Sequence, residues 1–359
     1  MINRIGKKKI AIIHNLSSGG AVRVLEELNR GLSKKYQIKV FQPPKLGSQK
    51  GIIGMFKYLG YLYYILPTSY RAISKKINAG GFKAAIVHHD SYFKSPPALF
   101  FLKVRSIYIL HEPPREFYEP SCFHAPRRID RLFNIFRVPI KYIDRYAVRR
   151  ADVVVTNSYF SKTRAEKIYG IKTRMIYPAI SNLFLSRSRV KKETICVSVG
   201  SLLPYKGHLL TIKALSRIGE IPRLVIVGNG RQKEKNRLLS EARKLNVNIE
   251  IFDSVSDKKL KQIYSNAMVY VNSAYQEPFG LSALEAVACG SKLVTVNNCG
   301  TAELKKFFPD RVVVTKRTVR GISNGIAKTL SNRIKENTAF PEIFKGKNTV
   351  NEIVKLIEN

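Results

Sequence analysis

Two glutamates flank a segment that the sequence predicts to be the start of a helix. Glu277 and Glu285 are separated by seven residues in the stretch EPFGLSALEA. Glu277 precedes a proline and so favours an extended conformation, while Ser282 can cap a helix that ends at Gly290. Free backbone N–H groups at a helix N-terminus bind phosphate or sugar oxygens, and carboxylates accept hydrogen bonds from hydroxyl groups. The pattern predicts a site for a phosphorylated, polyhydroxy ligand, with backbone amides from Phe279, Gly280 and Leu281.

A structural alternative exists for part of this pattern. Ser282 and Glu285 also fit an S-x-x-E capping box, in which the two side chains bond to the backbone and no ligand is needed. That alternative leaves Glu277, Phe279 and Gly280 unexplained.

Apolar runs that alternate with helical patterns predict the elements that position these residues. In the first half, Lys8–His14 leads through Gly19 and Gly20 into a helical pattern, and three more strand-like runs follow at 84–88, 106–110 and 152–157. The second half repeats the alternation at 195–199, 223–227, 249–252, 268–272 and 292–296. Strands that alternate with helices predict parallel sheets, whose ligands lie at the carboxyl ends of the strands. The fold class is therefore α/β, with two Rossmann-like domains.

The domain boundary is expected near residues 179–193, where polar residues and the charged stretch Arg187–Glu193 are typical of a linker. We expect an N-terminal domain over 1–185 and a C-terminal domain over 190–334. The tail, about 335–359, is expected to pack back on the first domain.

Positive charge is concentrated in the first half. The chain of 359 residues has a formal net charge of +38, with +25 over residues 1–190 and +6 over 195–305. Such a field attracts polyanions, including anionic lipid headgroups and lipid-linked diphosphates. No apolar stretch is long enough to span a membrane, and Met1–Lys9 is too basic for a signal peptide, so a cytoplasmic protein is expected. Four widely placed cysteines predict reduced thiols rather than a metal or redox site.

The segment Gly51–Leu66 belongs to neither series of elements. It is rich in tyrosine and aliphatic residues and is flanked by lysines and arginines. This composition suits an interfacial helix on an anionic membrane, and it equally suits a helix that packs on the domain.

Five motifs in order resemble the family 4 retaining glycosyltransferases, which have the GT-B fold of two Rossmann-like domains facing each other across a cleft. The glutamate pair resembles the E-x7-E signature of that family. The other four are similar to its N-terminal glycine loop, its histidine motif, its strand-end motif before the linker and its phosphate-binding loop; here they are Gly19-Gly20-Ala-Val-Arg23, His111-Glu-Pro-Pro-Arg115, Asn157-Ser158 and Gly200–Gly207.

The resemblance implies roles for single residues. Glu285 would bind the ribose, Glu277 a hydroxyl of the donor sugar, and His111 the region of the anomeric carbon; His111 and Glu277 are the catalytic candidates. The donor phosphates would contact Lys206 and the backbone of five residues: Gly19, Gly20, Phe279, Gly280 and Leu281. The resemblance further implies a hexosyltransferase that uses a nucleotide-sugar, with the acceptor on the side of the N-terminal domain and the donor in the C-terminal domain. The basic, tyrosine-rich N-terminal half favours a glycan or lipid-linked acceptor and an anionic membrane as partners.

The chain departs from the family at Ser201, where relatives usually carry an arginine that can bind phosphate through two parallel hydrogen bonds. Arg23 and Arg115, in neighbouring motifs, are candidates for the missing charge. No D-x-D triplet occurs, so neither a metal nor another cofactor is expected.

Three other functions lack the motifs that they require. A dinucleotide-dependent oxidoreductase would need G-x-G-x-x-G, but Arg231 follows Gly230, and a P-loop would need Gly-Lys-Ser/Thr, whereas Lys206 precedes Gly207. No base-reading motif supports a nucleic-acid binder. The alternative kept open is a catalytically impaired or non-enzymatic polyanion-binding protein on a GT-B scaffold. The favoured hypothesis places the enzyme at the inner face of a membrane.

Overall fold

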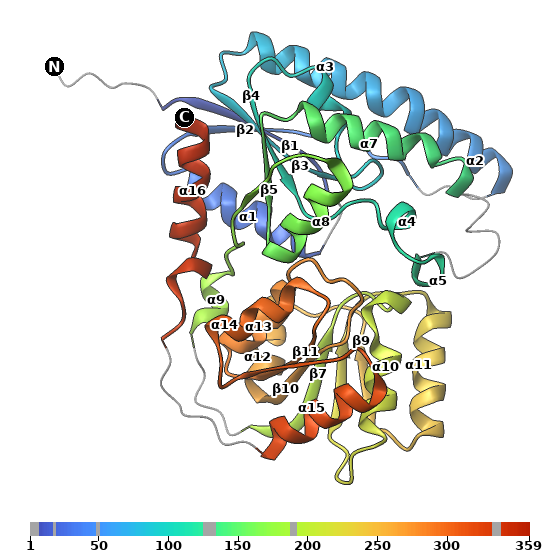
Figure 1. Cartoon of the computed structure of the whole chain (residues 1–359). Coiled ribbons are helices and arrows are strands. Elements are labelled where there is room, and N and C mark those ends of the chain that lie inside the picture. The colour runs from blue at the N-terminus through green and yellow to red at the C-terminus, as the bar shows by residue number, and fades with distance from the viewer. Residues whose placement is uncertain (1–6, 17–18, 48–50, 125–133, 187–191, 332–338) are drawn as a thin grey trace.

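The computed structural model describes residues 7–16, 19–47, 51–124, 134–186, 192–331 and 339–359. Most of the expected linker Arg187–Glu193 and the first part of the expected tail lie outside these residues. Figure 1 shows two α/β units, one above the other.

The N-terminal domain is built on a six-stranded parallel sheet of order β2-β1-β3-β4-β5-β6. The strands are β1 (Lys9–Asn15), β2 (Gln37–Phe41), β3 (Ala84–Asp90), β4 (Arg105–Leu110), β5 (Val153–Thr156) and β6 (Arg174–Met175). The helices are α1 (Gly20–Leu32), α2 (Gly51–Gly60), α3 (Leu66–Ala79), α4 (Arg115–Tyr118), α5 (Ser121–His124), α7 (Val138–Arg150) and α8 (Tyr159–Tyr169), with a 3-10 turn at Pro97–Phe100. Every residue of β3 is buried, as expected for a central strand that is covered on both faces.

The C-terminal domain repeats this design with a sheet of order β12-β11-β10-β7-β8-β9. Its strands are β7 (Glu193–Val199), β8 (Arg223–Val227), β9 (Ile249–Phe252), β10 (Ala267–Asn272), β11 (Lys292–Val296) and β12 (Val312–Thr315). Its helices are α10 (His208–Leu215), α11 (Gln232–Lys244), α12 (Asp257–Asn266), α13 (Leu281–Ala288), α14 (Leu304–Phe307) and α15 (Val319–Ser331), with 3-10 turns at Pro204–Lys206 and Gly300–Glu303. The predicted pair of Rossmann-like domains is confirmed.

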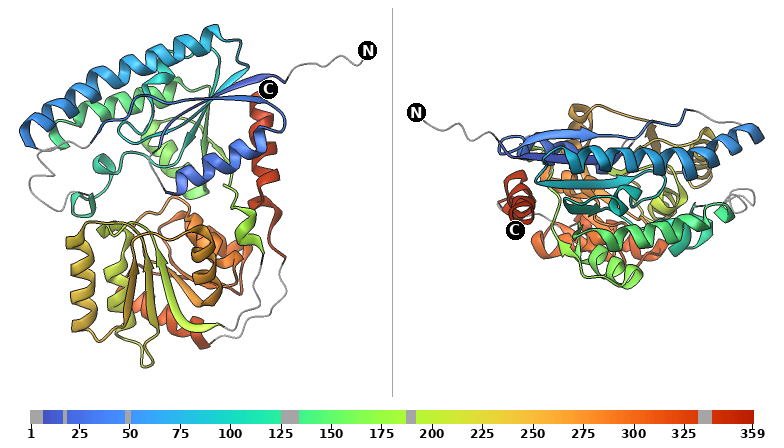
Figure 2. Two further views of the ribbon diagram at one scale, coloured as in Figure 1. Left: turned by 180° about the vertical axis from the view of Figure 1, so that it is seen from behind. Right: turned by 90° about the horizontal axis from the view of Figure 1, so that it is seen from above.

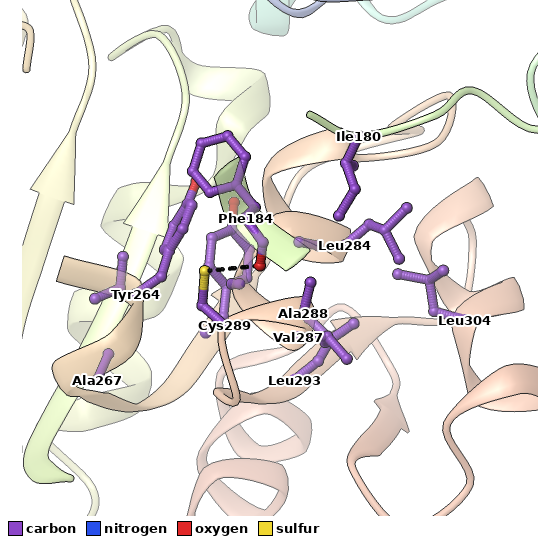
Figure 3. Close-up of a cluster of buried hydrophobic side chains, with 14 of the residues drawn as sticks. Ile180, Phe184, Tyr264, Ala267, Leu284, Val287, Ala288, Cys289, Leu293 and Leu304 are labelled. Atoms are coloured by element: carbon purple, nitrogen blue, oxygen red, sulfur yellow. Dashed lines mark hydrogen bonds between the residues drawn. The ribbon is translucent and has the colours of Figure 1, made fainter. Parts of the chain in front are cut away.

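The linker and the tail cross between the domains. Helix α9 (Asn182–Leu185), expected at the end of the N-terminal domain, packs on α12 and α13 instead. Figure 3 shows the reason: Phe184 inserts beside Tyr264, and its carbonyl accepts a hydrogen bond of 3.6 Å from Cys289 Sγ. The short apolar run of α9 therefore completes the core of the second domain.

The C-terminal segment returns to the first domain. Phe344, in the 3-10 turn Glu342–Phe344, still belongs to the core of the C-terminal domain. Helix α16 (Gly346–Glu358) then lies against α1, and Val350, Ile353 and Ile357 enter the N-terminal core (Figures 1 and 2). Both domains thus share the chain's last 20 residues.

The tyrosine-rich segment 51–66 is helical and runs without a break into α3. Helix α2 continues through a π-helical turn, Tyr61–Ile65, and Pro67 follows that turn, at the start of α3. Tyr61 and Leu62 are buried in the domain core, but Phe56 and Tyr64 are exposed. One face of this segment therefore packs on the domain and the other faces outward, and the interfacial alternative stays a prediction.

Candidate site at the domain interface

Two helix N-termini, one from each domain, meet at the interface. Helix α13 begins after Gly280, and α1 begins after Gly19; both glycines have a positive φ, 84° and 95°. A Cβ atom on Gly20 would lie 3.4 Å from Leu281 Cδ1, so the two helix starts are in near contact. Neither helix has a side-chain cap. Free N–H groups and the positive ends of two helix dipoles therefore converge on one place, which is suited to an anion.

Gly280 is required sterically as well as conformationally. A Cβ atom there would lie 2.4 Å from Thr301 Oγ1, and that hydroxyl donates a 2.8 Å hydrogen bond to the carbonyl of Phe279. The ring of Phe279 is buried in an aromatic cluster with Tyr177 and Phe344. Packing therefore holds the backbone that leads into α13.

Glu285 is buried in the second turn of α13 and pairs with the other domain. Arg23 Nη1 lies 2.9 and 3.0 Å from its two carboxylate oxygens, while Arg23 Nη2 lies 2.6 Å from Asp257. Burial raises the pKa of Glu285 to about 7, and the Arg23 guanidinium opposes that rise. Asp257 had not been predicted, because nothing in the sequence relates the first turn of α12 to α1.

The capping-box alternative for Ser282 and Glu285 is wrong. Ser282 is the second residue of α13 and not its N-cap, and its hydroxyl lies 2.7 Å from Tyr270 Oη. Glu285 is turned away from the backbone and towards Arg23. Its carboxylate is thus placed at the domain interface.

Lys206 and Glu277 form an ion pair beside α13. Lys206 Nζ lies 2.7 Å from Glu277 Oε2. Burial alone would lower the pKa of Lys206, but Glu277 outweighs it and the pKa is raised. Gly207 (φ 77°) ends the loop, and a Cβ atom on it would lie 2.4 Å from the carbonyl oxygen of Ser273. The phosphate-loop candidate therefore packs tightly on the strand that leads to Glu277.

Ser201 faces Tyr205, whose hydroxyl lies 3.4 Å from Ser201 Oγ. The Arg115 guanidinium lies over the Tyr205 ring, 4.6 Å from its centroid, so a cation does lie beside the position where relatives carry an arginine. Arg115 is, however, bonded to Glu112, Glu119 and two backbone carbonyls. Arg23 is bonded to Glu285 and Asp257. Both candidate arginines therefore already hold protein groups.

His111 follows β4 and lies among other histidines at the carboxyl end of the N-terminal sheet. The rings of His88 and His89 are each 5.9 Å from the His111 ring, centroid to centroid. Burial lowers the pKa of His111 to about 4 and that of His88 well below its usual range, so both rings are neutral near pH 7. His111 Nε2 and both ring nitrogens of His88 are buried without a hydrogen-bond partner. The consecutive histidines at the end of a buried strand were a signal that sequence reasoning missed.

The described residues contain neither a cluster of metal ligands nor a membrane-spanning helix. Among the described residues, no group of three or more His, Cys, Asp or Glu side chains is arranged to hold a metal ion. None of the described helices is long and apolar enough to cross a membrane. All four cysteines are free thiols, of which only Cys122 is exposed.

Several curated relatives of the chain are glycosyltransferases whose names give a lipid-linked substrate. It is 24% identical over 205 residues to mouse GDP-Man:Man(3)GlcNAc(2)-PP-Dol alpha-1,2-mannosyltransferase, but covers only 42% of that protein. It is 22% identical over 314 residues to a Campylobacter jejuni N-acetylgalactosaminyltransferase acting on a diphospho-undecaprenol substrate, and covers 81% of it. The alignments to the mouse and human mannosyltransferases span less than half the length of those proteins.

Solved structures share the whole architecture. Sucrose-phosphate synthase from Thermosynechococcus elongatus superimposes with a TM-score of 0.69 at 18% identity, covering 98% of this chain and 95% of that one. HepE from Anabaena, in complex with UDP and glucose, gives 0.67 at 16% identity, covering 98% and 99%. These are GT-B structures, and the likeness shows the fold.

Family models match nearly the entire chain in two adjoining parts. Residues 18–181 match the model described as Glycosyltransferase Family 4, and residues 182–343 match Glycosyl transferases group 1. With the GT-B architecture and the interface of two helix N-termini, these matches establish that the chain belongs to glycosyltransferase family 4, group 1 type.

Proposed function

We propose that this chain is a retaining glycosyltransferase that moves a hexose from a nucleoside-diphosphate sugar to a lipid-linked acceptor at the cytoplasmic face of a membrane. The observation that carries the proposal is the meeting of the N-termini of α1 and α13 at Gly20 and Leu281. Lys206 pairs with Glu277, which precedes α13 in the chain, and Arg23 pairs with Glu285, in the second turn of α13. A diphosphate between a sugar and a ribose matches that order of groups.

The donor is proposed to displace ion pairs within the protein. Ribose hydroxyls would take the Glu285 carboxylate from Arg23, which could then turn to the diphosphate. A sugar hydroxyl would share Glu277 with Lys206, whose ammonium can contact the diphosphate. The lost protein contacts are replaced by charge-assisted bonds to the ligand, so the exchange keeps buried charges paired.

Transfer is proposed to proceed on one face of the sugar, with departure of the diphosphate and attack of the acceptor on the same side. Lys206 and the two helix N-termini would stabilise the charge that develops on the leaving diphosphate, so we propose that no metal or other cofactor is required. Neutral His111 would position the sugar from the N-terminal domain. No side chain is assigned as a nucleophile.

The acceptor proposal is supported by the names of the mouse and Campylobacter jejuni relatives, whose substrates are diphosphate-linked to dolichol and undecaprenol. It is also supported by exposed apolar residues on the N-terminal domain, which come from α2, the π turn, the segment before α7 and α7 itself. We call this set the aromatic face; it comprises Ile53, Phe56, Tyr64, Ile135, Phe136, Tyr142 and Tyr146. A hydrogen bond from Tyr63 Oη to the carbonyl of Phe136 joins its two parts.

Cations border the aromatic face, as an anionic bilayer requires. Lys57 lies on α2, and Arg145 and Arg149 lie on α7 beside Tyr142 and Tyr146; all three cations are exposed. Aromatic rings settle at the depth of lipid headgroups, while the cations contact the anionic lipids.

A thermal-shift screen against UDP, GDP and ADP and their hexose conjugates tests the donor proposal. One nucleotide should stabilise the wild type, and Glu285→Gln should weaken that stabilisation. Glu250→Gln is the matched control, because Glu250 is an ion-paired carboxylate at the start of β9, away from the interface. If no nucleotide stabilises the wild type, the alternative of a non-enzymatic polyanion-binding protein is favoured.

Co-sedimentation with liposomes tests the membrane proposal. Binding should require anionic lipid, decrease at high salt, and decrease further in the variant Phe56→Ser/Tyr64→Ser. Thr68→Ala in the same helix, with a hydroxyl bonded only to backbone carbonyls of the preceding turn, is the control. If the wild type fails to bind anionic liposomes at low salt, the proposal is wrong.

A further inference from the structure

The backbone on both sides of Glu277 is held by the opposite domain. Arg115 donates to the carbonyls of Tyr275 and Gln276, at 3.1 and 3.2 Å. On the other side of Glu277, the hydroxyls of Ser158 and Ser161 donate to the carbonyl of Pro278, at 2.5 and 3.1 Å. These four bonds exist only while the two domains are together.

The segment has a conformation that needs support. Gln276 has a φ of 49°, in the left-handed region that residues other than glycine seldom adopt. On the side of its own domain, the N–H of Tyr275 donates a 2.7 Å hydrogen bond to the carbonyl of Tyr205. The peptide before Glu277 is thus held between Tyr205 and the Arg115 guanidinium, which itself lies over the Tyr205 ring.

Arg115 is suited to impose this geometry because its own position is fixed. Only 5% of the residue is exposed. Its Nε donates to Glu112 at 2.7 Å and its Nη1 to Glu119 at 3.1 Å. Those carboxylates are held in turn by Lys94, at 3.2 Å, and Arg164, at 2.6 Å. The planar guanidinium can reach two neighbouring carbonyls at once, which a lysine ammonium cannot do in the same geometry.

We propose that Arg115 is a positioning residue that couples domain closure to the placement of Glu277. In the closed form it seats the Tyr275–Gln276 backbone and so aims the Glu277 carboxylate at the donor sugar. In an open form this support is absent, and the sugar-binding carboxylate is not in its working position. The coupling makes catalysis depend on closure, which excludes water from the donor. The catalytic part of this inference rests on the proposed function.

Arg137 offers a matched control inside one domain. It is also largely buried, pairs with Glu116 at 2.8 Å, and donates to the carbonyl of Tyr92 at 3.0 Å and to the hydroxyl of Tyr58. All of these partners belong to the N-terminal domain. Arg115→Lys and Arg137→Lys therefore both keep a buried charge and lose a guanidinium, but only the first loses bonds between domains.

The first experiment measures closure without any ligand. Spin labels at Lys75→Cys on α3 and Ser240→Cys on α11, both exposed, are placed in a Cys122→Ser background and their distance distribution is recorded. Arg115→Lys should shift the distribution to longer, broader distances, and Arg137→Lys should leave it unchanged. Ser161→Ala, which unpairs no buried charge, should give a smaller shift in the same direction, and it replaces Arg115→Lys if that variant does not fold. Unchanged distances in the folded Arg115→Lys or Ser161→Ala protein would overturn the proposal.

The second experiment measures turnover of UDP-glucose and GDP-mannose. Arg115→Lys should lower kcat by about 10- to 100-fold while the donor KM changes by less than about threefold, since misplacement affects the reacting geometry more than ground-state binding. In a Glu277→Gln background, Arg115→Lys should lower kcat by less than about twofold, because the two residues act together. Additive losses would contradict positioning through Glu277. Because the spin-label measurement needs no substrate, its failure counts against Arg115 alone, whereas a wild type inactive on both donors counts against the proposed function.

Discussion

The two domains share one topology but present different chemistry where they meet. The C-terminal edge carries carboxylates and a lysine, Glu277, Glu285 and Lys206, all within hydrogen-bonding distance of a counter-charge. On the N-terminal edge, Arg23 and Arg115 reach across the interface, while His88 and the Nε2 atom of His111 are buried without partners.

The two domains contribute different kinds of side chain to the interface. The C-terminal edge holds the groups that are proposed to bind the nucleotide-sugar. The N-terminal edge supplies Arg23, which pairs with Glu285, and histidine rings with nitrogen atoms that have no hydrogen-bond partner. A ligand at the interface must therefore compete with the N-terminal domain for the same carboxylates. Each prediction below tests one side of this comparison.

Glu277→Gln should have the largest effect. Loss of the charge removes the partner of Lys206 and the proposed contact to the sugar, and transfer should fall by about 10²- to 10³-fold, the range seen when one stabilising group is lost at a reacting centre. Initial rates of sugar transfer measure this. Glu303→Gln, another interface carboxylate, which bonds to the Tyr159 and Phe160 N–H groups, is the control. Equal losses in the two variants would mean that Glu277 acts only in domain packing.

Arg23→Gln should change the pH dependence of nucleotide binding. The Glu285 pKa is already raised to about 7 by burial, and removing the opposing guanidinium should raise it further. Since the ribose hydroxyls are proposed to bind the ionised carboxylate, a rise of one pKa unit should lower the affinity for the nucleotide by about fivefold at pH 7, and the affinity should recover at higher pH. Calorimetric titration from pH 6 to 9 measures this shift. A loss of affinity that is equally large at every pH would contradict the shift and would point instead to the proposed contact of Arg23 with the diphosphate.

His88→Gln and His208→Gln should separate the two edges by stability. His208, in the C-terminal domain, bonds to Ser198 Oγ at 3.1 Å and to the carbonyls of Gly200 and Ser201. His208→Gln should lower the free energy of unfolding by about 1–3 kcal/mol at pH 7.5. His88 has no hydrogen bond to lose, so His88→Gln should lower it by less. Chemical denaturation at pH 7.5 measures both.

The stability of His88→Gln should also depend less on acid than the stability of the wild type. Burial lowers the pKa of His88 in the folded state, so its contribution to stability is present above pH 6.5 and is lost as the pH falls. His88→Gln should therefore be less sensitive to acid than the wild type, by about 1.4 kcal/mol per pH unit below 6.5. Burial raises the pKa of Asp144 to about 7, so Asp144 stabilises the folded state as the pH falls. This contribution is the same in the variant and the wild type, so it cancels when their stabilities are subtracted. Equal slopes would mean that His88 is not titrated on folding.

The sequence by itself determined most of the C-terminal edge. Glu277, Gly280 and Glu285 follow one another through a single strand–loop–helix unit, so local preferences are enough to bring them to the start of α13. The alternation of apolar runs likewise predicted the central strands of both sheets, since a strand buried on both faces must be apolar along its length. It missed the edge strands β2, β6 and β12, which are only partly buried.

Only the tertiary structure decided the partners. Arg23 and Glu285 are 262 residues apart, and Arg115 and Gln276 are 161 apart. No local preference relates such pairs, because their contacts depend on how one rigid sheet faces the other. The same reason explains α9: its apolar residues predicted burial, but the choice of the C-terminal core was made by the packing of Phe184 against Tyr264.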